Sequence, residues 1–342
     1  MLKLRKTGII AIAGIIISFV LTAVMPASAD TLKLTLASTL APNSNLELAA
    51  KQYADIIGEK TGGQIQITHY GGGSLYDAKD LIPAVAKNQV NMGILHVAMV
   101  GRRSGILEFV SSFGAMGCWT SFDHYYRFID LPEVRALADA EFEKYFNAKL
   151  LGPLAYGTGL FARSGKAIKT VEDFKGLKIR SSGAAQAAMF KVLGAVGVEL
   201  DSSEIYTALQ RGTIEACTTG SSRVRRARLY EVAPYITINP TEPFMSFYLV
   251  INKDVWGKIP AKDQALFIEE ARALEGWTRD FVANEYKEDL EAIGAKAKII
   301  YDMSPEEKKK LVAVVRPAMV EFSKKLLGDK HQEIWGLFDK AE

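Results

Sequence analysis

A strand–helix–strand–helix pattern between residues 171 and 217 constrains the fold of this chain more than any other stretch. Residues 177–180 alternate in polarity as a short strand does, and residues 184–193 follow as a helix-forming segment. Residues 196–200 then show a second strand pattern, and residues 205–211 a second helix pattern. Because strands that alternate with helices pair in parallel, this stretch predicts an α/β fold.

Arg180 is the most informative charged residue of this stretch, because it stands where the first strand ends. Ligands of open α/β sheets bind beyond the carboxyl ends of the strands. Ser182 and its small neighbours let the backbone approach a ligand closely. A guanidinium keeps its charge and offers paired N–H donors that match a carboxylate. We predict that Arg180 binds a carboxylate, with an ion pair at the rim of the sheet as the structural alternative.

Three motifs in this stretch carry a resemblance to a known family. They are D-x-K-G-L-K-I-R at residues 173–180, L-G-A at 193–195 and E-I-Y-T-A-L-Q-R-G-T-I-E at 204–215. In this order they resemble the signature of DctP-type substrate-binding proteins, the extracytoplasmic receptors of TRAP (tripartite ATP-independent periplasmic) transporters. The resemblance extends over nearly the whole mature chain.

The resemblance implies both a fold and partners. It implies an α/β, two-lobed periplasmic binding protein fold (type II-like), with mixed sheets in each lobe and a long helix that bridges both lobes. It implies that the protein delivers a small carboxylate ligand to the small and large integral membrane subunits of a TRAP transporter. A binding protein of an ATP-driven importer is an alternative within the two-lobed class.

The run from Pro260 to Ile293 supports the bridging helix independently. Gly276 alone interrupts a series of good helix formers with an apolar stripe. A helix of this length spans roughly 50 Å at 1.5 Å per residue. That exceeds one small lobe, so we expect it to contact both, which favours a TRAP receptor over an importer's binding protein.

The first 29 residues predict export. Basic residues, an apolar run and an A-x-A motif indicate a signal peptide cleaved before Asp30, with an uncleaved anchor as the alternative. Removing residues 1–29 removes Lys3, Arg5 and Lys6 and no acidic residue, so the formal charge falls from +3 to 0. A neutral mature chain gives no reason to expect a nucleic-acid partner. We expect a periplasmic protein.

The expected lobes are discontinuous in sequence. Residues 30–156 and 245–285 form lobe I, and residues 157–244 and 286–342 form lobe II. The chain crosses near Gly157 and near Phe244, and the ligand cleft lies between the lobes.

Four aromatic residues are candidates for an apolar wall of that cleft, since binding pockets are mostly apolar with a few polar groups. For two of them ordinary core packing is the alternative. A polar candidate, Thr219, stands where many members of the family carry an asparagine, so the resemblance implies a hydrogen bond to ligand. The aromatic candidates are Phe113, Trp119, Tyr156 and Phe244.

A second arginine, which many members of the family carry near the first crossing, is missing. Leu160 or Phe161 stands at that place, depending on where the count begins. Arg163 is a candidate replacement, with a solvated loop arginine as the alternative. The departure argues against a C4-dicarboxylate and favours a monocarboxylate with an apolar or aromatic body.

Catalytic motifs are absent from the sequence. Gly71–Gly73 lacks the residues of a phosphate-binding loop, G-x-S-x-G is missing, and the four histidines form no HExxH motif. We therefore predict no catalytic residues, metal ligands or cofactor, with a periplasmic enzyme acting on a small carboxylate as the alternative. Cys118 and Cys217 lack CxxC spacing, which favours isolated thiols but leaves a disulfide open. The oligomeric state also stays open.

Overall fold

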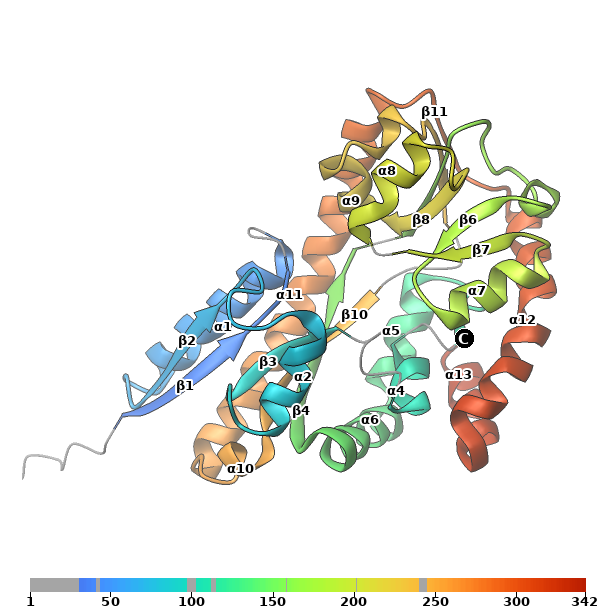
Figure 1. Cartoon of the computed structure of the whole chain (residues 1–342). Coiled ribbons are helices and arrows are strands. Elements are labelled where there is room, and N and C mark those ends of the chain that lie inside the picture. The colour runs from blue at the N-terminus through green and yellow to red at the C-terminus, as the bar shows by residue number, and fades with distance from the viewer. Residues whose placement is uncertain are drawn as a thin grey trace, which may run out of the picture.

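The computed structural model describes residues 31–40, 44–96, 103–111, 115–157, 159–200, 202–239 and 245–342. These residues form two mixed sheets (Figure 1). Lobe I is the five-stranded sheet with the helices packed on it, and lobe II is the six-stranded sheet with its helices. The expected two-lobed α/β fold is confirmed. The signal peptide lies outside the described residues. Among those described, no helix has the length and apolarity needed to cross a membrane.

Lobe I is built on a five-stranded sheet with the order β2-β1-β3-β10-β4. β1 pairs in parallel with β2 and β3, whereas β10 runs antiparallel to β3 and β4. Its strands are β1 (Leu32–Ala37), β2 (Ile65–Tyr70), β3 (Met92–His96), β4 (Ala148–Tyr156) and β10 (Met245–Asn252). Its helices are α1 (Asn45–Lys60), α2 (Ala78–Ala86), α4 (Gly105–Val110), α5 (Phe122–Asp130), α6 (Pro132–Phe146) and α10 (Lys253–Trp256).

Lobe II is built on a six-stranded sheet with the order β11-β9-β5-β8-β6-β7. β6 pairs in parallel with β7 and β8, as the strand–helix pattern predicts, and β5 runs antiparallel between β8 and β9. Its strands are β5 (Gly159–Arg163), β6 (Lys178–Ser181), β7 (Val196–Glu199), β8 (Ala216–Gly220), β9 (Tyr235–Ile238) and β11 (Ile299–Tyr301). Its helices are α7 (Ala184–Val192), α8 (Ile205–Gln210) and α9 (Ser221–Arg226).

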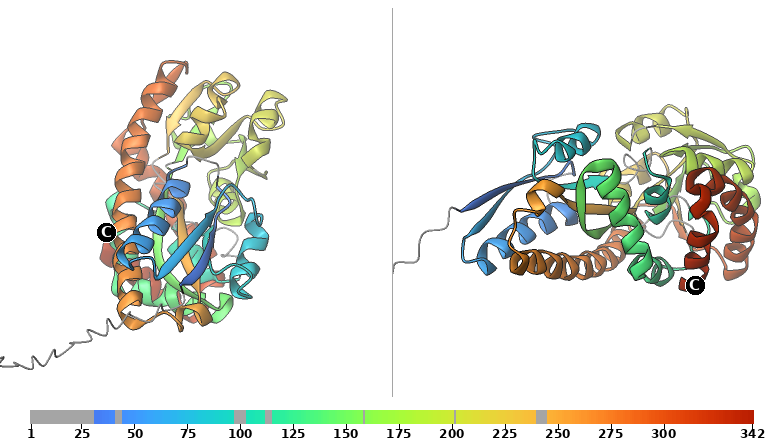
Figure 2. Two further views of the ribbon diagram at one scale, coloured as in Figure 1. Left: turned by 90° about the vertical axis from the view of Figure 1, so that its left-hand side faces the viewer. Right: turned by 90° about the horizontal axis from the view of Figure 1, so that it is seen from below.

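The expected bridging helix is α11 (Ala261–Gly294). It packs on α1 and β4 in lobe I and reaches α9 and β11 in lobe II (Figures 1 and 2). The buried side chains Phe267, Ala271 and Leu274 join the apolar core of lobe I, and Ile293 joins a core cluster of lobe II. The bridging role predicted from the length of this run is confirmed.

The C-terminal helices α12 (Pro305–Leu327) and α13 (His331–Ala341) also touch both halves of the molecule. α12 packs against α7 of lobe II and α4 of lobe I, and α13 packs against α5 (Figure 2). At the start of α4, a Cβ on Gly105 would lie 1.9 Å from the backbone oxygen of Leu326, so the residue must be glycine for this approach. α12 continues as helix through Pro317.

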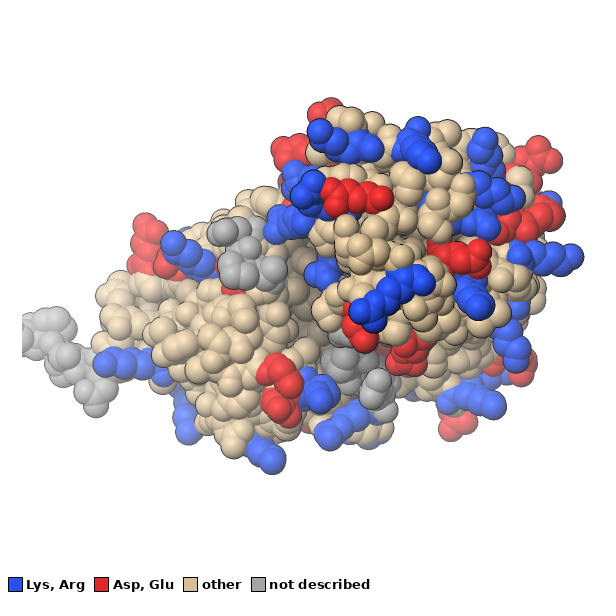
Figure 3. All heavy atoms as spheres, turned by 45° about the horizontal axis from the view of Figure 1, so that its top comes forward, with Lys and Arg blue, Asp and Glu red and all other residues tan. Residues whose placement is uncertain are grey.

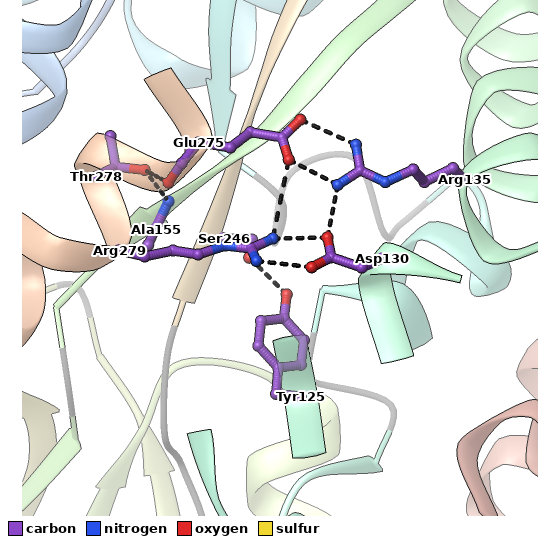
Figure 4. A network of polar contacts seen from close by, with 8 residues as sticks. All are labelled: Tyr125, Asp130, Arg135, Ala155, Ser246, Glu275, Thr278 and Arg279. Atoms are coloured by element: carbon purple, nitrogen blue, oxygen red, sulfur yellow. Dashed lines mark hydrogen bonds and ion pairs between the residues drawn. The ribbon is translucent and has the colours of Figure 1, made fainter. Parts of the chain in front are cut away.

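A polar network fixes α11 to α5 and α6 (Figure 4). Arg135 donates to both carboxylate oxygens of Glu275, at 2.9 and 2.6 Å, and to Asp130 at 2.6 Å. Arg279 donates twice to Asp130, at 2.7 Å each, and its guanidinium stacks on the ring of Tyr126. The Glu275 side chain is 5% exposed, so its charge depends on these partners.

The same region holds the ends of the two strands that lead to and from lobe II. The hydroxyl of Tyr125 is hydrogen bonded to Ser246 in β10, and the backbone N–H of Ala155 in β4 donates to Thr278 in α11. The end of β4 and the start of β10 are therefore anchored to α11 and α5 beside the crossings (Figure 4).

Candidate ligand-binding site

Arg180 lies near the carboxyl end of β6, and its side chain is buried between neighbouring strands. Its Nε donates to the carbonyl of Leu200 at 3.0 Å, and its Nη1 donates to the carbonyl of Thr218 at 3.3 Å. These two acceptors fix the plane of the guanidinium.

A row of three rings lies at the carboxyl end of the sheet in lobe I, on three adjacent strands. His96 ends β3, Phe247 lies in β10, and Tyr156 ends β4. The Phe247 ring centroid lies 4.7 Å from that of His96 and 5.1 Å from that of Tyr156. The sequence predicted Tyr156 as a residue of the apolar wall of the cleft, but it gave no role to His96 or Phe247, which only strand pairing brings together.

His96 is the residue of lobe I whose charge state couples to Arg180. Burial lowers the pKa of the His96 imidazole to about 4, and the positive charge of Arg180 contributes to that shift. The imidazole is therefore neutral at pH 7 and provides one donor and one acceptor. The two residues come from different lobes and are close enough for this electrostatic interaction.

Thr219 lies on the same face of the lobe II sheet as Arg180. Arg180 pairs with Cys217 in β8, and Thr219 follows two residues later, so the alternation of a strand gives both the same side. Leu160 pairs with Thr219 and shares that face, but Phe161 points to the other side. Leu160 is fully buried and belongs to the apolar core of lobe II.

Arg163 is not brought together with Arg180. Cys217 pairs with Ala162, so Ala162 shares the face of Arg180 and the next residue, Arg163, faces the opposite side of the sheet. There its Nη1 donates to the carbonyl of Asp173 at 3.2 Å.

The remaining predicted residues lie in different surroundings. The backbone N–H and the hydroxyl of Ser182 donate to Gln186 Oε1, at 2.7 and 3.1 Å, which orders the turn into α7. Trp119 is buried in the core against Tyr125 and Phe338, the packing role that the sequence left open. Phe113 and Phe244 lie outside the described residues.

Residues 36–325 match the family model DctP, described as bacterial extracellular solute-binding protein, family 7. The chain belongs to this family. The family description places the protein outside the cytoplasm. DctP-family receptors bind solutes and are not enzymes, so the enzymatic alternative is set aside.

Individual relatives agree with this assignment. The C4-dicarboxylate-binding protein DctB of Bacillus subtilis is 25% identical over 83% of this chain and 80% of its own length. A TRAP periplasmic solute-binding protein of Ochrobactrum anthropi has a TM-score of 0.83 at 20% identity, covering 91% of this chain and 96% of that one. DctP7 of Bordetella pertussis, a receptor for pyroglutamic acid, has a TM-score of 0.78 at 18% identity and covers 90% of this chain and 100% of that one.

One cluster in this DctP-family chain contains the residue types of a hydrolase but not the geometry. His69 Nε2 lies 3.1 Å from the hydroxyl of Ser38 and 3.2 Å from the carboxylate of Glu47. A catalytic triad uses the two ring nitrogens separately, whereas here one nitrogen contacts both partners. Burial alone would raise the pKa of Glu47, but hydrogen bonds from His69 and Ser38 outweigh it and lower the pKa. The cluster ties the loop after β1 to the end of β2.

The cysteines and the metal prediction can also be examined in the structure. Cys118 and Cys217 are buried free thiols, as their spacing favours. Burial raises the pKa of the Cys217 thiol to about 12, although Arg180 lies near it. Within the described ranges, no three His, Cys, Asp or Glu residues gather as metal ligands.

Proposed function

We propose that this protein is the periplasmic receptor of a TRAP transporter and binds an organic monocarboxylate through Arg180. The observation that carries the proposal is the position of Arg180: a buried guanidinium, oriented by two backbone carbonyls, at the carboxyl end of β6. A fixed guanidinium in a closed cleft matches a carboxylate in both charge and geometry.

The surroundings of Arg180 favour one carboxylate and an apolar or ring-bearing body. His96 and Tyr156 are partly exposed where β3 and β4 end, and the ring of Phe247, which is buried in the core of lobe I, lies between them. His96 is neutral at pH 7, and Leu160 provides no charge on the face of Arg180. A C4-dicarboxylate, which the relative from Bacillus subtilis binds, would need a second cation close to the first. Pyroglutamate, the ligand of DctP7, is a ring-bearing monocarboxylate of the kind proposed here.

Capture would proceed by closure of the two lobes about the crossings that follow β4 and precede β10. Arg180 and Thr219 come from lobe II, whereas the ring row comes from lobe I. A ligand that contacts both sides stabilises the closed form, which the membrane subunits of the transporter would then recognise.

The test compares two arginines on opposite faces of one sheet. Thermal unfolding in the presence of each acid of a panel identifies an acid that binds by the rise of the unfolding midpoint. A ligand at about a hundredfold over its dissociation constant adds about 2.7 kcal/mol to the free energy of unfolding. Calorimetry then gives its affinity for wild type, Arg180→Ala and Arg163→Ala. We expect Arg180→Ala to weaken binding by roughly two to four decades. This corresponds to a cost of about 3–5 kcal/mol for leaving the buried carboxylate of the ligand without its partner.

Arg163→Ala removes the same side chain from the other face, and we expect it to bind like wild type. Binding by Arg180→Ala within tenfold of wild type would refute the role of Arg180. A wild-type protein that no organic acid stabilises would refute the carboxylate ligand class.

A further inference from the structure

A buried asparagine, Asn239, connects three strands of lobe II beside the second crossing. The two halves of the molecule meet at a hollow in the surface (Figure 3), and β9 is the strand that ends before the chain crosses back to lobe I. Asn239 follows β9 directly and is 4% exposed. Its backbone N–H donates to the carbonyl of Gly159 in β5 at 3.3 Å, and its Nδ2 donates to the hydroxyl of Thr218 in β8 at 3.1 Å.

Asn239 approaches the Arg180 site from the opposite face of the sheet. Cys217 shares the face of Arg180, so the next residue of β8, Thr218, points its side chain to the other face. The amide of Asn239 is hydrogen bonded to that side chain and therefore lies on the same side as it does. A ligand held by Arg180 is separated from this amide by the backbone of β8.

Thr218 joins Asn239 to Arg180 through its two oxygens. Its hydroxyl accepts from Asn239, and its carbonyl accepts from Nη1 of Arg180 at 3.3 Å. The second distance lies just beyond the common range of about 2.7–3.2 Å, so a shift of β8 by a few tenths of an ångström would break this bond. Nε of Arg180 would still donate to Leu200, and the guanidinium could turn about that remaining contact.

The orientation of the guanidinium matters because it decides how well a carboxylate fits. Arginine binds a carboxylate most strongly through two parallel N–H···O bonds, and both bonds require one plane of the group. Buried polar networks whose members are satisfied make their surroundings rigid. The buried pair of Asn239 and Thr218 therefore restrains the strand that presents its carbonyl to Arg180.

We propose that Asn239 is a positioning residue of the Arg180 site and fixes the plane of the guanidinium through Thr218. The inference rests on the proposed function and adds a residue that controls affinity without contact to the ligand. The backbone bond to Gly159 also ties Asn239 to the strand that follows the first crossing. The orientation of Arg180 is thereby linked to the geometry of both crossings.

The test is a double-mutant cycle on affinity, with pyroglutamate and benzoate as probes in titration calorimetry. We expect Asn239→Ala to weaken the binding of at least one of these acids by about tenfold, the scale of one hydrogen bond to a charged group. Thr218→Val keeps the carbonyl and the shape but removes the hydroxyl, and it should have the same effect. Because both changes break one link, the double variant should bind no more weakly than either single variant. If Asn239→Ala does not fold, Thr218→Val removes the same bond from the other side.

Asn252→Ala is the matched control. Asn252 is a fully buried asparagine at the opposite end of β10 from the crossing, where its Nδ2 donates to the carbonyl of Val85 at 2.9 Å. The variant should lower the thermal midpoint of unfolding, as Asn239→Ala does, but bind both acids like wild type. This comparison separates an effect on the Arg180 site from a general loss of stability.

Three results would overturn the inference: unchanged affinity in Asn239→Ala, losses that add in the double variant, or an equal loss of affinity in Asn252→Ala. If Arg180→Ala still weakens binding in those cases, the proposed function stands without Asn239. A wild type that binds neither acid also overturns the inference, and the proposed function then depends on whether another acid of the panel binds through Arg180. A wild type that binds no acid at all refutes both.

Discussion

The network between α11 and α5–α6 allows a stability effect to be worked out from the structure. In Arg135→Met the apolar stem remains, but Glu275 loses two charge-assisted hydrogen bonds and Asp130 loses one. Arg279 still lies 3.8 Å from Glu275 and keeps both its bonds to Asp130. Removing one partner of a buried ion pair costs 3–5 kcal/mol. Because Arg279 remains, we expect a loss at the lower end, about 3 kcal/mol.

The pH dependence identifies the cause of this loss. Burial raises the pKa of Glu275 above its ordinary value, and Arg135 opposes that rise. Without Arg135 the pKa of Glu275 in the folded protein rises further above its value in the unfolded chain. The free energy of unfolding of Arg135→Met is therefore highest below the unfolded-state pKa and falls as the pH rises through the folded-state pKa. The loss in Arg135→Met should therefore be about 3 kcal/mol at pH 7 and about 1 kcal/mol at pH 4.5.

Denaturant unfolding of the chain without residues 1–29 measures these free energies at both pH values. The double variant Arg135→Met/Glu275→Gln should recover part of the loss at pH 7, since the charge left by the first change is removed. Lys340→Met breaks an exposed pair with Glu133 and should leave the midpoint unchanged. The reasoning fails if the loss in Arg135→Met is the same at both pH values, or if the double variant is no more stable than the single one.

Two further results are expected. Gly71→Ala would place a Cβ 2.0 Å from Oε2 of Glu47, so the cluster that ties the loop after β1 to β2 must shift, and we expect a lower thermal midpoint of unfolding. In the control variant Gly165→Ala the new Cβ meets nothing within 4 Å, so the midpoint should not change. Burial lowers the pKa of His96 to about 4, so the imidazole stays neutral and the affinity for a monocarboxylate should be constant between pH 6 and 8. A steep change of that affinity with a midpoint near pH 6.5 would contradict the assigned environment of His96.

The sequence determined the parts of this protein that depend on local pattern. Alternation in residues 177–180 predicted β6 and placed Arg180 at its end, because parallel strands present their carboxyl ends to ligands. The unbroken helix formers after Pro260 predicted α11 and its bridging role, because length alone excludes a single lobe. The family motifs lie in the same stretch, so the fold and the receptor class followed from local evidence.

Strands without a clear period were not predicted. β5 is a nearly continuous apolar run and β8 consists of small residues, and neither alternates in polarity. These are the strands whose register decides that Thr219 lies on the face of Arg180 and Arg163 on the other. A one-residue change of register would exchange these faces, and nothing local in the sequence fixes it.

The ring row depends on contacts between distant segments. His96 and Phe247 are separated by about 150 residues, and they meet because β10 returns from lobe II to pair with β3. Local periodicity specifies which segments become strands and helices. Which side chains share a cleft is decided by the pairing order of the strands and by the packing of one lobe against the other.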